Sequence, residues 1–218
     1  MEPLLRNIVV MDWITILIFV SLLFVVLAKG VFYTRFLNFI ILPFNNKYIF
    51  MYNKKEKLLN WFNLFFGLFL IINFSLFLYL GRNILFEPAQ NSVIVVFPLI
   101  LASIVLFLFI KLTLQMGNGF IFGTQKTISE VIFKKLSYFN YSGLIMFVAN
   151  VILTYIAIGS KVVFYTAFLI ILLVNVIGWI TIIRNHQKFI TANFFYFILY
   201  LCALEIAPFI LIGSYLID

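Results

Sequence analysis

Glu205 is the residue of this chain best placed to do chemistry, because it is a carboxylate in the middle of an apolar run, 193–217. If that run crosses a bilayer, an ionisable group at mid-depth is costly and marks a functional site by default. Hydrocarbon disfavours the charged form, so we expect a protonated or hydrogen-bonded carboxyl. Pro208 removes a backbone hydrogen bond and pushes away the carbonyl of Leu204, beside the carboxyl. Such a site binds a proton, a cation or a partner helix, or is only a kink with a buried hydrogen bond.

Four other polar residues fall at a similar depth when each apolar run is treated as a membrane helix. Counted at about 1.5 Å per residue from the more basic end, Glu205 lies about 18 Å deep and the others lie about 12–21 Å deep. We therefore expect one central polar layer, to which five helices contribute. Lys111 is nearer the end of its helix, where we expect it to snorkel outward; a Lys111–Glu205 pair is the alternative. The four residues are Asn73, Ser103, Asn150 and Asn175.

The composition places this whole chain in a membrane. Of its 218 residues 65% are hydrophobic and 10% are charged, whereas soluble domains have about 45–50% apolar and about 25% charged residues. A spanning helix needs about 20 mostly apolar residues. Six runs qualify, so we expect an all-α bundle of six transmembrane helices, a single domain over residues 1–218. The runs are 13–31, 59–80, 92–114, 141–158, 162–183 and 193–217.

The basic residues predict how the chain is threaded. Twelve of the 15 Lys and Arg residues lie in or beside the first, third and fifth connections. Connections rich in Lys and Arg stay in the cytoplasm, so both termini are expected to face outward, on the other side of the membrane. The net charge of +8 belongs to this pattern and forms no basic stripe with interleaved aromatics, so we expect no nucleic-acid partner.

Two basic connections are too apolar to be plain linkers. Residues 31–42 are too short to span and suit a helix lying at the cytoplasmic interface. Residues 127–139 begin with Thr127 and Glu130 at capping-box spacing, so a second interfacial helix is expected there. Simple packing under the bundle is the alternative for both. Between the first two runs, three lysines are candidate contacts for lipid headgroups or a partner, or serve only as the orientation signal. These are Lys54, Lys55 and Lys57.

The sequence holds no recognisable catalytic or cofactor-binding constellation. It has one cysteine, Cys202, and one histidine, His186, and no cluster has the spacing of metal ligands. No Ser or Thr has a paired base that would activate it as a nucleophile. We expect a non-enzymatic protein without a metal or cofactor.

The last apolar run also carries a resemblance to a known family. The stretch 193–208, which ends in Glu-Ile-Ala-Pro, is similar to the signature of a family of uncharacterised multi-pass membrane proteins of Bacteroidota. Residues 6–8, 12–13, 42–44 and 46–48 extend the similarity over most of the chain. The resemblance implies an inner-membrane location and a domain of unknown function, and no established activity.

A small bundle with little mass outside the membrane suits an accessory or scaffolding subunit of a larger inner-membrane complex. Its expected partners are membrane lipids and other inner-membrane subunits. The alternative is a small transporter or proton-coupled carrier that uses Glu205. A membrane enzyme acting on lipid is a third reading, which rests only on the basic connections.

Overall fold

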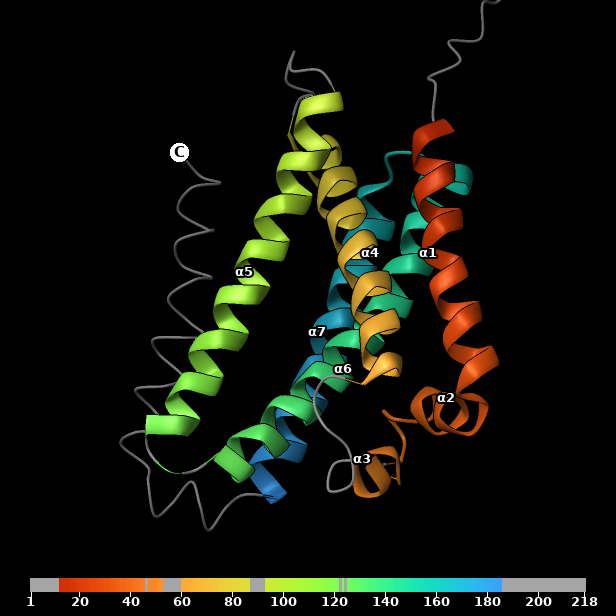
Figure 1. Ribbon diagram of the computed structural model, residues 1–218. Coiled ribbons are helices and arrows are strands. Elements are labelled where there is room, and N and C mark those ends of the chain that lie inside the picture. The colour runs from red at the N-terminus through yellow and green to blue at the C-terminus, as the bar shows by residue number, and fades with distance from the viewer. Residues whose placement is uncertain are drawn as a thin grey trace, which may run out of the picture.

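A computed structural model describes residues 12–45, 47–52, 60–86, 93–121, 123 and 125–185 of the chain. These residues form helices and their connections, with no strand among them. Within the described ranges, five helices are long and apolar enough to cross a membrane (Figure 1). They are α1 (Asp12–Val31), α4 (Trp61–Leu85), α5 (Val93–Ile121), α6 (Gln125–Val151) and α7 (Lys161–Asn185).

These five helices correspond to the first five predicted runs, whereas the sixth, 193–217, lies outside the described residues. Helices suit such sequences because an apolar environment offers no partner to the backbone, and a helix satisfies its own N–H and C=O groups. Both α4 and α5 extend beyond their predicted ends, by five residues at Leu85 and seven at Ile121. Once formed, a helix continues through a few polar residues because each added residue completes one more backbone hydrogen bond.

The helices differ greatly in how much they are enclosed. Helix α4 is central and packs against α1, α5 and α6, while α6 also packs against α5 and α7. In its most apolar window, 56% of α4 is buried, compared with 11% of α5. Figure 1 shows α5 at one side of the bundle, near α4 at one end and near the start of α6 at the other.

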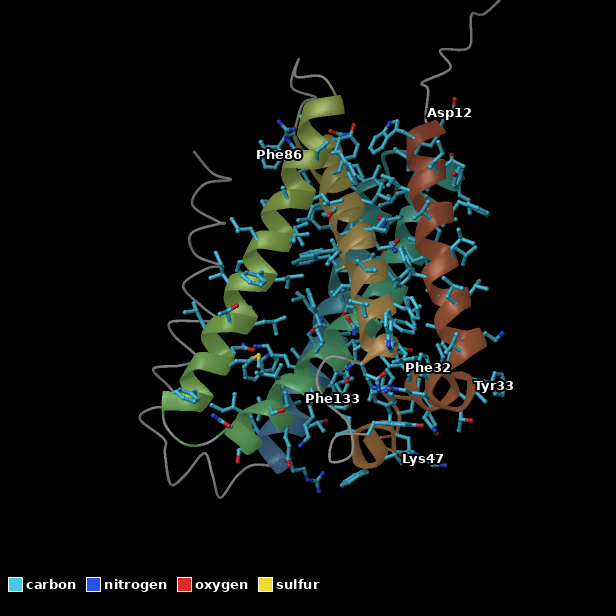
Figure 2. The ribbon with its side chains drawn as sticks, viewed as in Figure 1. Asp12, Phe32, Tyr33, Lys47, Phe86 and Phe133 are labelled. Atoms are coloured by element: carbon cyan, nitrogen blue, oxygen red, sulfur yellow. The ribbon has the colours of Figure 1, made fainter. Side chains whose placement is uncertain are left out.

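Two short helices lie together at one end of the bundle, which we call the α2–α3 end. Helix α2 (Tyr33–Ile40) falls within the predicted interfacial segment 31–42, and α3 (Lys47–Tyr52) was not predicted. Phe39 of α2 packs against Phe66 of α4, with ring centroids 4.5 Å apart. Figure 2 places Lys47 and Phe133 at this end and Asp12 and Phe86 at the opposite one.

The second interfacial helix, expected over 127–139 as an element separate from a span at 141–158, is wrong. Helix α6 runs without a break from Gln125 to Val151 and continues as a π-helical turn, η1 (Ile152–Ile156). No glycine or proline interrupts 127–142. Ser137 and Ser142 donate hydrogen bonds to the carbonyls of Phe133 and Tyr138, one turn back. The polar residues before 141 were interpreted as lying outside the span, but the structure includes them in one continuous helix.

Two glycines shape the junctions of α7. Gly159 lies between η1 and α7 with φ of +71°, a left-handed conformation that glycine adopts without steric cost. Gly178 lies where α7 packs tightly against α6, since a Cβ there would be 2.7 Å from Cγ of Tyr138. These contacts fix α7 against α6 and so place the polar side chains described next.

Candidate functional site

The structure joins two of the predicted layer residues directly. Asn150 Nδ2 of α6 donates to the backbone oxygen of Asn73 of α4 at 2.9 Å and faces its Oδ1 at 3.4 Å. Asn73 in turn donates to the carbonyl of Phe69 at 2.9 Å. Both asparagines are fully buried. A buried amide that bonds across a helix interface stabilises that interface by about 0.6 kcal/mol on average.

Asn175 belongs to a different level of the bundle. Its Nδ2 donates to Ser142 Oγ of α6 and to the carbonyl of Ile171, both at 2.8 Å. Ser142 and Asn150 are eight residues apart on α6, which corresponds to about 12 Å. The single central layer expected from sequence is thus two levels, one joining α6 to α4 and one joining α6 to α7. The estimate failed because it counted depth from span ends that the helices do not share.

Ser103, the fourth predicted layer residue that the structure describes, does not join these two levels. Ser103 is exposed on α5 and donates to the carbonyl of Ile100 of its own helix at 2.7 Å. Five predicted site residues lie outside the described part of the chain: Glu205, Pro208, Lys54, Lys55 and Lys57.

Two buried oxygens near the Asn73–Asn150 contact have no hydrogen-bond partner among the residues that the structure describes. They are Oδ1 of Asn150 and Oγ1 of Thr154, which lie four residues apart. Thr154 lies in η1, and π-helical turns in α-helices are frequent at functional sites. The two oxygens can accept hydrogen bonds or ligate a small cation. The sequence analysis indicated Asn150 but not Thr154, which is 2% exposed.

Sequence analysis missed a buried arginine at the α2–α3 end. Arg35 is 4% exposed, and its guanidinium carbon lies 4.7 Å from the ring centroid of Phe62 and 4.8 Å from that of Tyr52. Its nitrogens reach Tyr48 Oη at 3.4 Å and Asn63 Oδ1 at 3.3 Å. Arg35 therefore links α2, α3 and α4. The signal in the sequence was an arginine surrounded by aromatic residues, which we counted only toward chain orientation.

A second basic cluster lies where α5 meets α6. Lys135 Nζ of α6 is out of contact with solvent and lies 4.9 Å from the ring centroid of Trp179 of α7. Lys111 of α5 is close enough to Lys135 for their charges to interact. Its ammonium lies over the ring of Phe107 at 5.5 Å, one turn toward the middle of α5.

Gln115 belongs to the same cluster by position. It follows Lys111 by one turn on α5 and is 2% exposed, and its Nε2 has no hydrogen-bond partner within the described part of the chain. In the described ranges no three His, Cys, Asp or Glu residues come together as metal ligands do.

Five long apolar helices, of which α4, α6 and α7 are joined by amide hydrogen bonds, are compatible with a membrane-embedded helical bundle. The chain belongs to the family described as a domain of unknown function (DUF4271), whose model matches residues 14–216. No curated protein and no solved structure matches the chain. The resemblance found in the sequence is thus confirmed at the level of an uncharacterised domain family.

Proposed function

We propose that this protein is a non-enzymatic accessory or scaffolding subunit that docks, through α5, onto a larger assembly of the bacterial inner membrane. The observation that carries the proposal is the outer face of α5. This helix is the least enclosed of the five, and a regular seam of residues runs along its exposed side.

The seam repeats at alternating intervals of four and three residues, the spacing of residues that meet a second helix. All of its members are exposed, three apolar and three small or hydroxylated. Small residues let two helix backbones approach closely, and membrane helix interfaces are enriched in them. The seam consists of Leu99, Ser103, Leu106, Ile110, Thr113 and Gly117.

The hydroxyls of the seam are compatible with a face that meets lipid or another helix. Ser103 donates to the carbonyl of Ile100 at 2.7 Å, and Thr113 donates to that of Phe109 at 2.8 Å. Neither hydroxyl therefore needs an acceptor on a partner. Close packing of the small residues is the interaction that a partner helix would add.

The interior also supports a scaffold. Asn150 bonds directly to α4 and Asn175 bonds directly to α6, so these amides are engaged in holding helices together. The inner-membrane location, the two periplasmic termini and a source in Bacteroidota are parts of the proposal that rest on the basic connections and on the family resemblance.

Photocrosslinking in native membranes tests the docking face. A photoreactive amino acid at Leu106, which is 61% exposed, should capture a partner protein. The matched control is Leu169 of α7, which is 57% exposed and lies outside the seam. We expect crosslinks at Leu106 alone, and we expect Gly117→Leu to weaken them because a bulky side chain keeps a second helix away. A monodisperse monomer after gentle extraction, with no crosslink at Leu106, contradicts the proposal.

A carrier that uses Glu205 is the second candidate, and the unpartnered oxygens of Asn150 and Thr154 favour it. A carrier requires that Glu205→Gln abolishes transport or proton release while the protein still folds. A scaffold tolerates Glu205→Gln, whereas Glu205→Leu loosens the assembly. Transport assays in vesicles, run beside the crosslinking experiment, separate the two.

A further inference from the structure

Helix α2 carries an apolar stripe on the side that faces away from the bundle. Tyr33, Leu37 and Ile40 follow one another at intervals of four and three residues, so they lie on one side of the helix. They are 59%, 48% and 37% exposed, and Phe44, in the turn after α2, is 91% exposed. Figure 2 shows Tyr33 at the outer edge of the α2–α3 end. Whatever surrounds this end of the bundle therefore meets large apolar side chains.

The charged residue of α2 is turned the opposite way. Arg35 is 4% exposed and contacts Tyr48 of α3 and Asn63 of α4. Asn38 is 8% exposed, and its Nδ2 donates to the carbonyl of Thr34 at 3.0 Å. A helix at the surface of a water-soluble domain turns its charged residues outward and its apolar stripe toward the core. An apolar medium therefore suits the outer side of α2 better than water does.

The position of α2 places the stripe at the end of a membrane-length helix. Helix α1 has 20 residues and is about 30 Å long, which matches the hydrocarbon core of a bilayer, about 30 Å thick. Phe32, with φ of −128° and ψ of 51°, separates α1 from α2. Figure 1 shows α2 lying across the end of α1 rather than continuing its direction. When α1 spans a bilayer, the stripe is therefore at the boundary between acyl chains and headgroups.

The residue types at this end fit a lipid surface better than a second helix. Interfaces between membrane helices are enriched in small residues, and the stripe has none, in contrast to the seam on α5. Tyrosine, by comparison, is enriched where its amphipathic ring sits at the level of the headgroups. Lys29, in the last turn of α1, and Lys47, at the start of α3, are both exposed at the same end. Basic residues near the membrane surface attract anionic headgroups.

We propose that α2 is an in-plane membrane anchor, whose apolar stripe is inserted into the boundary between headgroups and acyl chains. Helices of this kind bury their apolar side about 5–10 Å into that boundary. The inner side of α2 is fixed by the contacts of Arg35 and by Phe39, which packs on Phe66 of α4. The anchor is therefore joined to the core of the bundle. Its partner is the lipid surface beside α1, and it requires no second protein.

Depth-dependent fluorescence quenching in the full-length chain tests the anchor. In a Cys202→Ser background, Leu37→Cys is labelled with a thiol-reactive fluorophore, and the protein is reconstituted into phosphatidylcholine vesicles with iodide on both sides. Lipids brominated near the headgroup should quench this label more than lipids brominated near the end of the acyl chain, and iodide should quench it little. Leu23→Cys, near the middle of α1 and 45% exposed, is the matched control and should show the opposite order of the two lipids. A label at Lys47→Cys should be quenched mainly by iodide.

Labels at the two ends of the stripe test whether α2 lies flat. Tyr33 and Ile40 are seven residues apart, about 10 Å along the helix, so labels at Tyr33→Cys and Ile40→Cys should report the same depth. Different depths overturn the in-plane arrangement.

Two results for the Leu37 label overturn the anchor itself. If iodide reaches it as readily as it reaches the Lys47 label, the stripe faces water. If neither brominated lipid nor iodide reaches it, protein covers the stripe. The vesicles contain no other protein, so the result is independent of whether α5 docks onto a partner, and either proposal can fail alone.

Discussion

Gly178 of α7 lies against the side chain of Tyr138 of α6. The Cβ that any other residue would add at Gly178 would lie 2.7 Å from Cγ and 2.8 Å from Cδ2 of Tyr138. Those ring atoms are near the backbone of α6 and have little freedom to move aside. At the scale of single residues, tight packing therefore restricts which residue a position tolerates, as polar contacts do.

We predict that Gly178→Ala lowers the free energy of unfolding by about 1–3 kcal/mol, because the added methyl group overpacks the α6–α7 interface. Reversible unfolding in mixed detergent micelles measures this change. Gly67→Ala on α4 is the control, since nothing lies within 4 Å of the added Cβ. It should stabilise the helix by about 0.5–1 kcal/mol. Equal effects of the two substitutions would disprove the close approach.

A second position where one residue type is required is Arg35, and its positive charge alone does not explain the requirement. Its guanidinium lies over aromatic rings and reaches two oxygens from different helices. Lysine keeps the charge but loses the planar, multiply donating group. Arg35→Lys should therefore cost about 2 kcal/mol of unfolding free energy and speed proteolysis between α2 and α3. Arg82→Lys, in the last turn of α4, is the control and should change neither; a stable Arg35→Lys variant would show that charge alone suffices.

At the scale of elements, α6 is the helix that organises the others. It contacts α4, α5 and α7, and its side chains supply both interhelical amide contacts and one lysine of the basic cluster. Hydropathy alone divided it in two, because Lys134, Lys135 and Asn140 lower the local apolar content. The pattern could not show that these residues face neighbouring helices rather than water.

A proline placed at the predicted boundary tests the continuity of α6. Tyr141→Pro should cost about 3 kcal/mol or more beyond the cost of Tyr141→Ala, because it removes a backbone hydrogen bond inside a helix. Unfolding of the two variants measures the difference. If residue 141 began a new helix instead, proline would fit its first turn and the two variants would be alike.

At the scale of the whole molecule, the long apolar runs predicted five helices to within a few residues, except at the ends of α4 and α5 and at the start of α6. Run length and apolar content are sufficient for this because a helix depends on its own backbone bonds. The sequence also placed Asn73 and Asn150 in one polar layer, since both are amides in apolar runs, but it did not predict their direct hydrogen bond. The pairing of Asn175 with Ser142 was not, because it depends on how α7 is shifted along α6, and sequence periodicity does not encode that offset.

The direction in which the chain crosses the membrane is a prediction from its basic connections, and thiol labelling tests it. In a Cys202→Ser background, a membrane-impermeant thiol reagent added to spheroplasts should label Lys161→Cys and leave Lys29→Cys unlabelled. Both positions are exposed, so accessibility within the fold does not separate them. After the membrane is permeabilised, both should react. Labelling of Lys29→Cys alone would reverse the orientation.

The π-helical turn η1 has a consequence for the length of the chain. Its bond from Ala157 N to the Ile152 carbonyl, at 2.8 Å, encloses one residue more than an ordinary helical turn. Deleting a single amino acid there, such as the exposed Ile156, would let the same two groups close a standard turn without lengthening or shortening the path to α7. A homologue with a one-residue gap at this point could therefore share the architecture, and the gap would mark local loss of the wide turn rather than a shift in the register of the helices.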